Sequence, residues 1–304
     1  MTGKVLFISL AFVFLCAYAC FSQEQFTKFE EWNPVSAGPL TTWTAPVCEK
    51  GQLIVQPFFF YNHTRGTFND EGDYSVLPEG DKKRSFAEQF FFQYGLTNKL
   101  EFAGQSIYQQ NYIEQSGEKA RARGMGDSYL YLRYCLLEEE KIRPFITGVF
   151  QVKVPSGKYQ HAAEDKLGAD LMGSGAWEHG YGVIVTKKIK PFVFHADALY
   201  SFPLSARIDD VKTLYANNFT YDFGVEYFFS RGFNLLCEIN GFIQGDTQEE
   251  GDRIPGTDTG YVVFAPGIGW SNDKIQTLFC YQRVLAGTNC DANDSVALTF
   301  VYTF

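Results

Sequence analysis

The chain has 304 residues, of which 17% are aromatic, with 30 Phe and 18 Tyr. This length fits two average domains or one large all-β domain, and so many aromatic side chains must fill a large core or face something other than water. The net charge of −9 argues against a nucleic-acid partner, because such proteins carry a basic surface that neutralises phosphates.

The first residues have the features of a secretory signal peptide. Lys4 precedes a short apolar run, and A-Y-A at positions 17–19 suits cleavage before Cys20. We predict a signal peptide over residues 1–19, with cleavage up to about residue 22 as a variant. The alternative is a lipoprotein signal in which Cys20 carries the lipid, although the two residues before Ala19 are unusual for that.

Residues 20–50 contain Pro34, Pro39 and Pro46 and predict an irregular N-terminal segment in the periplasm. After the signal, no apolar run approaches the roughly 18 residues that a membrane-spanning helix needs, which excludes a helical membrane protein. A β-barrel stays open, because its strands need only about 9–11 residues of alternating pattern.

From residue 51 to residue 304, apolar and polar residues alternate in one segment after another. Twelve segments follow this pattern: 53–61, 90–94, 100–109, 127–136, 146–154, 177–185, 192–202, 219–229, 233–244, 262–270, 275–281 and 296–304. Strict alternation is typical of strands in an antiparallel sheet whose two faces meet different surroundings. We therefore predict about twelve strands.

The connections between these segments favour one fold. Five are tight (95–99, 138–142, 187–190, 230–232, 271–274) and six are long and polar (64–84, 113–126, 155–176, 203–217, 247–259, 286–293). Short and long connections alternate, as in outer-membrane barrels, where short turns face the periplasm and long loops face outside. The predicted fold is an all-β antiparallel transmembrane barrel over residues 51–304, with about 12 strands.

A closed barrel is the one β-structure that satisfies its backbone in lipid, and its outer face can be apolar. Aromatic residues near the predicted strand ends suit the two membrane interfaces: Tyr94, Trp177, Phe202, Phe229, Trp270 and Phe304. The last strand, with Phe300, Tyr302 and Phe304 on one face, resembles the C-terminal signal that the bacterial barrel assembly machinery recognises. The expected partners are this machinery, outer-membrane lipid and lipopolysaccharide.

Three segments resemble one family. G-M-G-D at 124–127, a strand ending in P-S-G at 155–157 and G-S-G-A-W at 173–177 follow the order found in the family named after the meta-pathway of phenol degradation. The resemblance covers mainly residues 85–230. It implies an outer-membrane barrel of the kind described as a channel or transporter in aromatic-compound catabolism.

Ten charged or titratable residues are predicted to line the lumen: Glu101, Arg133, Lys153, Glu178, His195, Asp197, Asp222, Glu226, Glu238 and Arg283. Twelve strands lie between the filled eight-stranded barrel and the wide sixteen-stranded porin, so a narrow pore and a plugged lumen are both open. These residues form either a salt-bridge network that stiffens the wall or an acidic constriction that favours cations.

The chain lacks the common catalytic motifs, and we predict no catalytic residue. An outer-membrane phospholipase would need a His and a Ser on the outer wall; His179 is predicted to point outward near Trp177, without an H-x-S pattern. Acidic tracts at 68–74 and 246–258 lack calcium-loop spacing and read as solvated loop charge. No metal and no cofactor are expected.

These observations predict a bacterial outer-membrane protein that passes small solutes passively, and the family resemblance favours hydrophobic or aromatic solutes. Two alternatives stay open at this stage. One is a plugged structural or adhesive barrel that acts through its extracellular loops. The other is an outer-membrane hydrolase of the phospholipase kind.

Overall fold

The structure is a computed structural model that describes residues 34, 36–230 and 232–304. The predicted signal peptide, Cys20 and the start of the predicted periplasmic segment lie outside the described residues. Among the described residues, no helix is long and apolar enough to cross a membrane.

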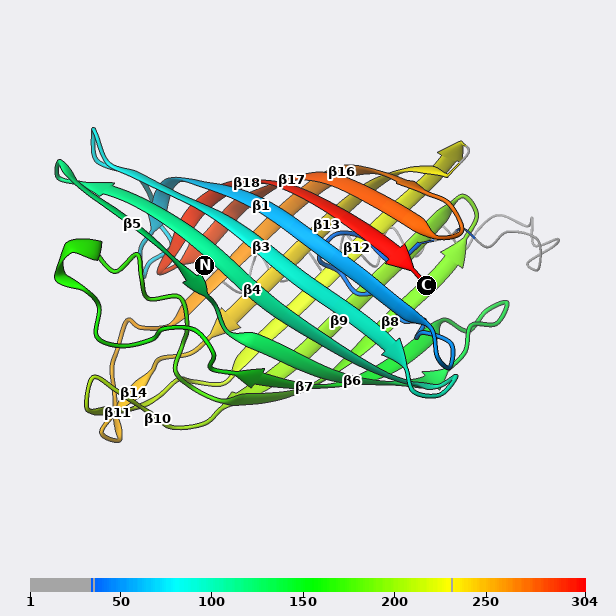
Figure 1. Ribbon diagram of the computed structural model, residues 1–304, viewed down its shortest axis with the longest axis horizontal. Helices are drawn as coiled ribbons and strands as arrows, with labels where there is room; N and C mark the ends of the chain where they lie inside the picture. Colours follow the sequence, from blue (N-terminus) through cyan, green and yellow to red (C-terminus); the bar gives the residue numbers. More distant parts are fainter. Residues whose placement is uncertain (1–33, 35, 231) are drawn as a thin grey trace. The chain divides into compact units, whose positions relative to one another are not determined.

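Twelve long antiparallel strands form a closed barrel (Figure 1). They are β1 (Leu53–Phe68), β3 (Lys82–Gly95), β4 (Leu100–Gln115), β6 (Ser128–Leu137), β7 (Phe145–Val154), β8 (Glu178–Ile189), β9 (Phe192–Pro203), β12 (Asn218–Ser230), β13 (Phe233–Gln244), β16 (Thr259–Ser271), β17 (Ile275–Thr288) and β18 (Cys290–Thr303). Each strand pairs with the next along the chain, and β18 returns to pair with β1 along its whole length. The predicted fold class and strand number are confirmed.

Short elements decorate the end of the barrel where the long connections lie. They are β2 (Tyr74–Val76), β5 (Glu118–Met125), η2 (Glu164–Lys166), β10 (Ala206–Ile208), β11 (Val211–Leu214), β14 (Gln248–Glu249) and β15 (Asp252–Arg253). β5 pairs with residues 108–115 of β4, and β6 pairs with residues 100–105 on the same edge of β4. β10, β11, β14 and β15 form a small separate sheet.

Two of the predicted long loops are largely strand. The segment 113–126 is a hairpin of β4 and β5 that turns at Ser116 and Gly117, and 286–293 is a hairpin that turns at Asn289. All three turn residues have left-handed φ values, of 52°, 86° and 47°. The prediction was wrong here because both segments consist mostly of small and polar residues, which are typical of loops, although Ala120 and Ala292 are 3% and 0% exposed.

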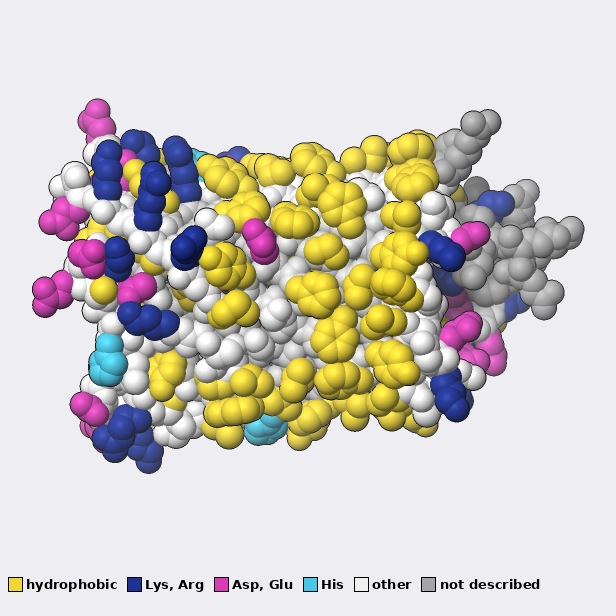
Figure 2. Space-filling view, viewed as in Figure 1, with side chains coloured by type: hydrophobic (Ala, Val, Ile, Leu, Met, Phe, Trp, Pro, Cys, Tyr) yellow, Lys and Arg dark blue, Asp and Glu magenta, His cyan; other side chains and the backbone are white. Residues whose placement is uncertain are grey.

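The outer wall of the barrel is apolar over its middle (Figure 2). We call this band the apolar belt; exposed side chains in it include Phe90, Leu130, Tyr181, Leu235, Ile268, Phe279 and Phe300. Inside the barrel, a second apolar cluster forms around Phe58, Phe91, Tyr131, Leu236 and Leu278. Apolar residues thus form both the outer belt and the inner cluster, and polar residues occupy the remaining inward positions.

Candidate functional site: the barrel lumen

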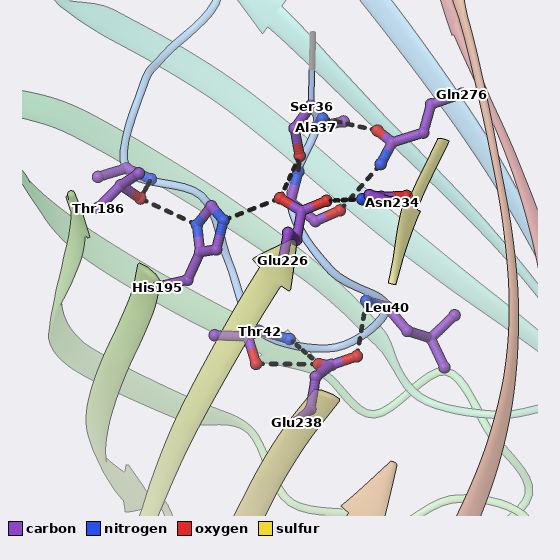
Figure 3. Close-up of polar contacts among 12 residues, drawn as sticks. Ser36, Ala37, Leu40, Thr42, Thr186, His195, Glu226, Asn234, Glu238 and Gln276 are labelled. Carbon is purple, nitrogen blue, oxygen red and sulfur yellow. Dashed lines mark hydrogen bonds and ion pairs between the residues drawn. The ribbon is translucent and has the colours of Figure 1, made fainter. Parts of the chain in front are cut away.

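Residues 36–48 run inside the barrel and are bound to its inner wall (Figure 3). We call them the plug segment. Its side chains at Leu40, Ala45 and Cys48 are 4%, 0% and 4% exposed. The strand residues that hold it lie near the short turns, so the plug segment fills that half of the lumen. Residues 36–48 form neither helix nor strand and lie inside the barrel, whereas the sequence predicted an irregular segment in the periplasm.

Glu238 on β13 binds the middle of the plug segment. Its carboxylate accepts hydrogen bonds from the backbone N–H groups of Leu40, Thr41 and Thr42 at 2.8, 2.9 and 2.8 Å, and from the Thr42 hydroxyl at 2.9 Å. Glu238 is 0% exposed. Four donors converging on one buried carboxylate compensate for much of its desolvation without a cation.

Glu226 on β12 binds the start of the plug segment. One carboxylate oxygen accepts from the Ser36 hydroxyl at 2.6 Å and lies 3.0 Å from Nε2 of His195. The other oxygen accepts from the side-chain amide of Asn234. Nδ1 of His195 lies 3.1 Å from the Thr186 hydroxyl oxygen, which itself accepts from the backbone N–H of Ala45. The network therefore joins four strands, β8, β9, β12 and β13, to Ser36 and Ala45 of the plug segment.

A buried ion pair holds the other side. Arg133 on β6 donates to Glu101 on β4 at 2.6 Å, and both side chains are 0% exposed. Arg133 also donates to the backbone carbonyl of Thr44 and lies 5.0 Å from the Trp43 ring centre. Glu101 in turn accepts from the backbone N–H of Cys48 at 2.7 Å. A pair this deeply buried needs such extra hydrogen bonds, since removing two charges from water is costly.

Between the plug segment and the long loops lies a cavity of about 950 Å³. Most of its aromatic lining comes from the strands β1, β3 and β6 and from the plug segment: Phe58, Phe60, Phe91, Tyr129, Tyr131 and Trp43. Tyr215, Phe242 and Tyr261 add three rings elsewhere on the lining. Strands β9, β12 and β13, about halfway around the barrel from these, supply the polar residues Asp197, Asp222 and Asn240. The cavity thus has an aromatic side and an acidic side.

The acidic side is a single row across three strands. Asp197, Asp222 and Asn240 are register partners on β9, β12 and β13, and the row continues into Ile184 and Val263 on its flanks. Asp197 accepts from the backbone N–H of Trp43 at 2.8 Å, and Asp222 accepts from the Asn240 amide at 2.8 Å. The Oδ1 atom of Asn240 has no partner among the described residues. No ion pair among the described residues includes Asp197 or Asp222.

The structure places nine of the ten predicted lumen residues inside the barrel, where Lys153 and Glu178 pair at 2.9 Å. Arg283 is the exception. Its position on β17 alternates in phase with the outward Phe279 and Tyr281, and its side chain is 47% exposed. It lies 3.8 Å from Asp294 of β18, which supplies the charge partner on the outer wall. The assignment of Arg283 to the lumen was therefore wrong.

Sequence reasoning missed the partners of these residues. The plug segment gave no signal beyond its prolines, because its contacts join residues up to about 240 positions apart. Asn234 and Asn240 were visible as inward positions of an alternating strand, but an amide there predicts nothing about its partner. Thr186 gave no signal of its own.

The model of the family described as "Putative MetA-pathway of phenol degradation" matches residues 74–299. The chain belongs to this family. Among solved structures, it is similar to the COG4313 outer membrane channel from Pseudomonas putida F1, at 16% identity over 90% of this chain and 100% of that chain, with a TM-score of 0.69. The NanC porin gives 9% identity over 82% and 98%, with a TM-score of 0.51. No curated protein matches the chain.

The motifs that resemble this phenol-degradation family meet at one point at the loop end of the barrel. Asp127 accepts from the backbone N–H of Gly157 at 3.2 Å and from the N–H and hydroxyl of Ser174, both at 2.8 Å. A Cβ atom on Gly173 would lie 2.6 Å from Asp127 Oδ1 and 2.7 Å from the Gly157 carbonyl oxygen. The three motifs are thus a packing cluster that fixes the long 155–177 connection.

His179, the residue weighed for hydrolase chemistry, lies on the outer wall of this family member. Its ring stacks on Phe202 at 5.4 Å between centres and meets Tyr181 edge-on at 5.8 Å. These neighbours suit an interfacial aromatic girdle. Of the two similar structures, one is a channel and the other a porin. That this chain has no catalytic activity stays a prediction.

Proposed function

We propose that the protein is a passive channel of the bacterial outer membrane for small solutes, with hydrophobic or aromatic solutes favoured. The observation that carries this proposal is the cavity of about 950 Å³ inside a closed barrel, with aromatic residues along one side. Family membership and the fold of an outer-membrane channel support it. Aromatic walls bind flat apolar solutes by stacking and burial of apolar surface.

Passage through the lumen requires the plug segment to shift, because residues 36–48 fill the half near the short turns. The segment carries no regular secondary structure and is held mainly by hydrogen bonds to side chains of the wall. The bonds to the Glu238 carboxylate contribute about 1.5–3 kcal/mol each, so the segment shifts only where water replaces them. The plug segment is thus the gate of the proposed channel.

Planar-bilayer recording of the purified mature protein tests the proposal. We expect stepwise currents, and larger steps from a variant that lacks residues 36–48. Benzyl alcohol added to one chamber should reduce the current by occupying the aromatic side of the cavity. If neither protein conducts and both are folded, the channel is rejected in favour of the plugged barrel that acts through its loops.

The plugged-barrel alternative rests on the filled lower lumen. It predicts that removing residues 36–48 lowers stability without opening a path. Heat-modifiable electrophoretic mobility, which distinguishes folded from unfolded barrels, separates this outcome from simple misfolding of the variant.

A further inference from the structure

A basic surface lies on the outer wall where β3, β4 and β5 extend beyond the apolar belt. Figure 2 shows basic side chains gathered at this end, at the upper left. Five exposed cations form what we call the basic lattice: Lys82, Arg84, Lys119, Arg121 and Arg123. The chain as a whole carries a net charge of −9, so a cluster of five cations on one face is not a result of composition.

Strand register arranges these residues in three rows. Lys82, Glu114 and Lys119 are cross-strand partners in the outermost row, and Arg84, Tyr112 and Arg121 in the next. The third row is Phe86, Gln110 and Arg123. Neighbouring strands lie about 4.8 Å apart and successive residues of one face about 7 Å apart. Arg84 and Arg121 therefore stand about 10 Å apart, on either side of Tyr112.

The charges in this lattice are not all compensated. Glu114 lies 3.2 Å from each of Lys82 and Lys119 and accepts from the Tyr112 hydroxyl at 2.8 Å. These hydrogen bonds, with that from Tyr112 the largest, lower the pKa of Glu114 to about 2, so it stays ionised. No ion pair among the described residues includes any of the three arginines of the lattice. Arg121 lies over the Tyr112 ring at 5.1 Å, which leaves its N–H groups free to face outward.

The lattice borders an open groove of about 500 Å³ whose floor is aromatic, with Tyr61 and Phe86 among its lining residues. The same outer face continues into the apolar belt, where Phe90 and Met125 are 50% and 45% exposed. A ligand that lies here meets guanidinium groups above and the mainly apolar belt below, where one exposed carboxylate, Glu88, shares a row with Met125. Free phosphate or a soluble acidic chain would contact only the guanidinium groups and leave the apolar belt uncovered.

We propose that the basic lattice binds the phosphate groups of an acidic glycolipid of the outer leaflet, of the lipopolysaccharide class, while its acyl chains lie along the apolar belt. Guanidinium groups match phosphate oxygens with paired hydrogen bonds, and they bind phosphate more specifically than lysine does. Arg84 and Arg121 lie two strands apart, with a backbone separation of about 10 Å, so their guanidinium groups can approach one phosphate from two sides. This site is separate from the lumen, so it does not depend on the proposed channel function.

The test compares a lipid with and without its phosphates. Purified full-length mature protein in neutral detergent is titrated with bisphosphorylated hexa-acylated lipid A and with the same lipid after removal of both phosphates. Native mass spectrometry counts the bound lipid. The test variant carries Arg84→Gln, Arg121→Gln and Arg123→Gln; the control carries Lys50→Gln, Lys99→Gln and Lys274→Gln, an equal charge change at the short-turn end.

A cation near an anionic lipid surface contributes about 1 kcal/mol, so the triple variant should bind lipid A about a hundredfold more weakly. The control should match the wild type, and the difference should shrink in high salt. Glu114→Gln should bind more tightly, because it frees both lysines. The proposal is overturned if the dephosphorylated lipid binds as well as lipid A, if the arginine variant is unchanged while folded, or if a lipid-free acidic polysaccharide competes equally.

Discussion

At the scale of single residues, the lumen shows how buried carboxylates are compensated. Glu101 has a cation, Glu226 a histidine and an amide, and Glu238 only backbone and hydroxyl donors. An unpaired buried charge costs several kcal/mol. The plug segment and the acidic wall therefore depend on each other, and removing either partner leaves the other unsatisfied.

Glu238→Gln should loosen the plug segment. The amide loses the charge that attracts three backbone N–H groups, each bond of this kind being worth about 1.5–3 kcal/mol. With Leu40→Cys as a buried reporter, maleimide labelling should become at least about tenfold faster. Glu88→Gln, the same change at an exposed position of β3, is the matched control and should leave the rate unchanged. Equal rates for both variants would show that Glu238 does not hold the segment.

Asp222→Asn should reduce the preference of the channel for cations. Asp222 has no ion-pair partner among the described residues, and a carboxylate at a constriction favours cations by electrostatic attraction. Reversal potentials in a salt gradient should show a roughly twofold fall in the cation-to-anion permeability ratio. Asn240→Asp, which adds a charge in the same row, should raise it. An unchanged ratio in both variants would contradict the assignment of the row to the permeation path.

The inward position of these residues was predictable, but their partners were not. Alternation along a strand is a local property, so it placed Glu101, Asp222 and Glu238 inside. Hydrogen bonds such as that from Leu40 to Glu238 join residues 198 positions apart, and no local pattern encodes them. Arg283 was misassigned because a polar residue at an outward position can be balanced by a cross-strand partner, here Asp294.

At the scale of elements, alternation revealed strands only within the membrane band. There one face meets lipid and the other the lumen, so the two faces differ in composition. The outer ends of β4, β5, β17 and β18 consist mostly of small and polar residues and were predicted to be loops, although Ala120 and Ala292 are buried there. Their turns depend on single residues with left-handed φ, such as Asn289, which a sequence does not distinguish from other asparagines.

Gly173→Ala should disturb the cluster of loop motifs around Asp127. The added methyl group would lie 2.6 Å from the carboxylate and 2.7 Å from a backbone carbonyl, which forces the 155–177 connection to move. We expect a loss of about 1–3 kcal/mol locally, seen as faster proteolysis within this connection. Gly148→Ala is the control, since its Cβ would make only an ordinary contact at 3.5 Å with Leu136. Equal rates of proteolysis for the two variants would show that Gly173 is not needed for packing around Asp127.

At the scale of the whole molecule, the fold was predictable because its topology needs no long-range information beyond closure. Each strand pairs with its neighbour in the chain, and one further pairing, β18 with β1, completes the barrel. The plug segment lies outside this rule, since it pairs with no strand. The sequence therefore predicted the barrel but not the plug segment inside it.

Phe304 lies at the seam between β18 and β1, where the barrel closes. The backbone N–H of Phe304 donates to the Leu53 carbonyl at 2.9 Å, and Phe300 and Tyr302 point outward from β18. Deleting Phe304 should therefore slow insertion, both by weakening the seam and by removing the end of the predicted assembly signal. Phe279→Ala, which removes an equally large exposed ring from the neighbouring β17, should leave assembly close to normal. The measurement is the fraction of heat-modifiable, folded protein in outer membranes; an equal yield from both variants would mean that the terminal Phe acts only as one more contact with lipid.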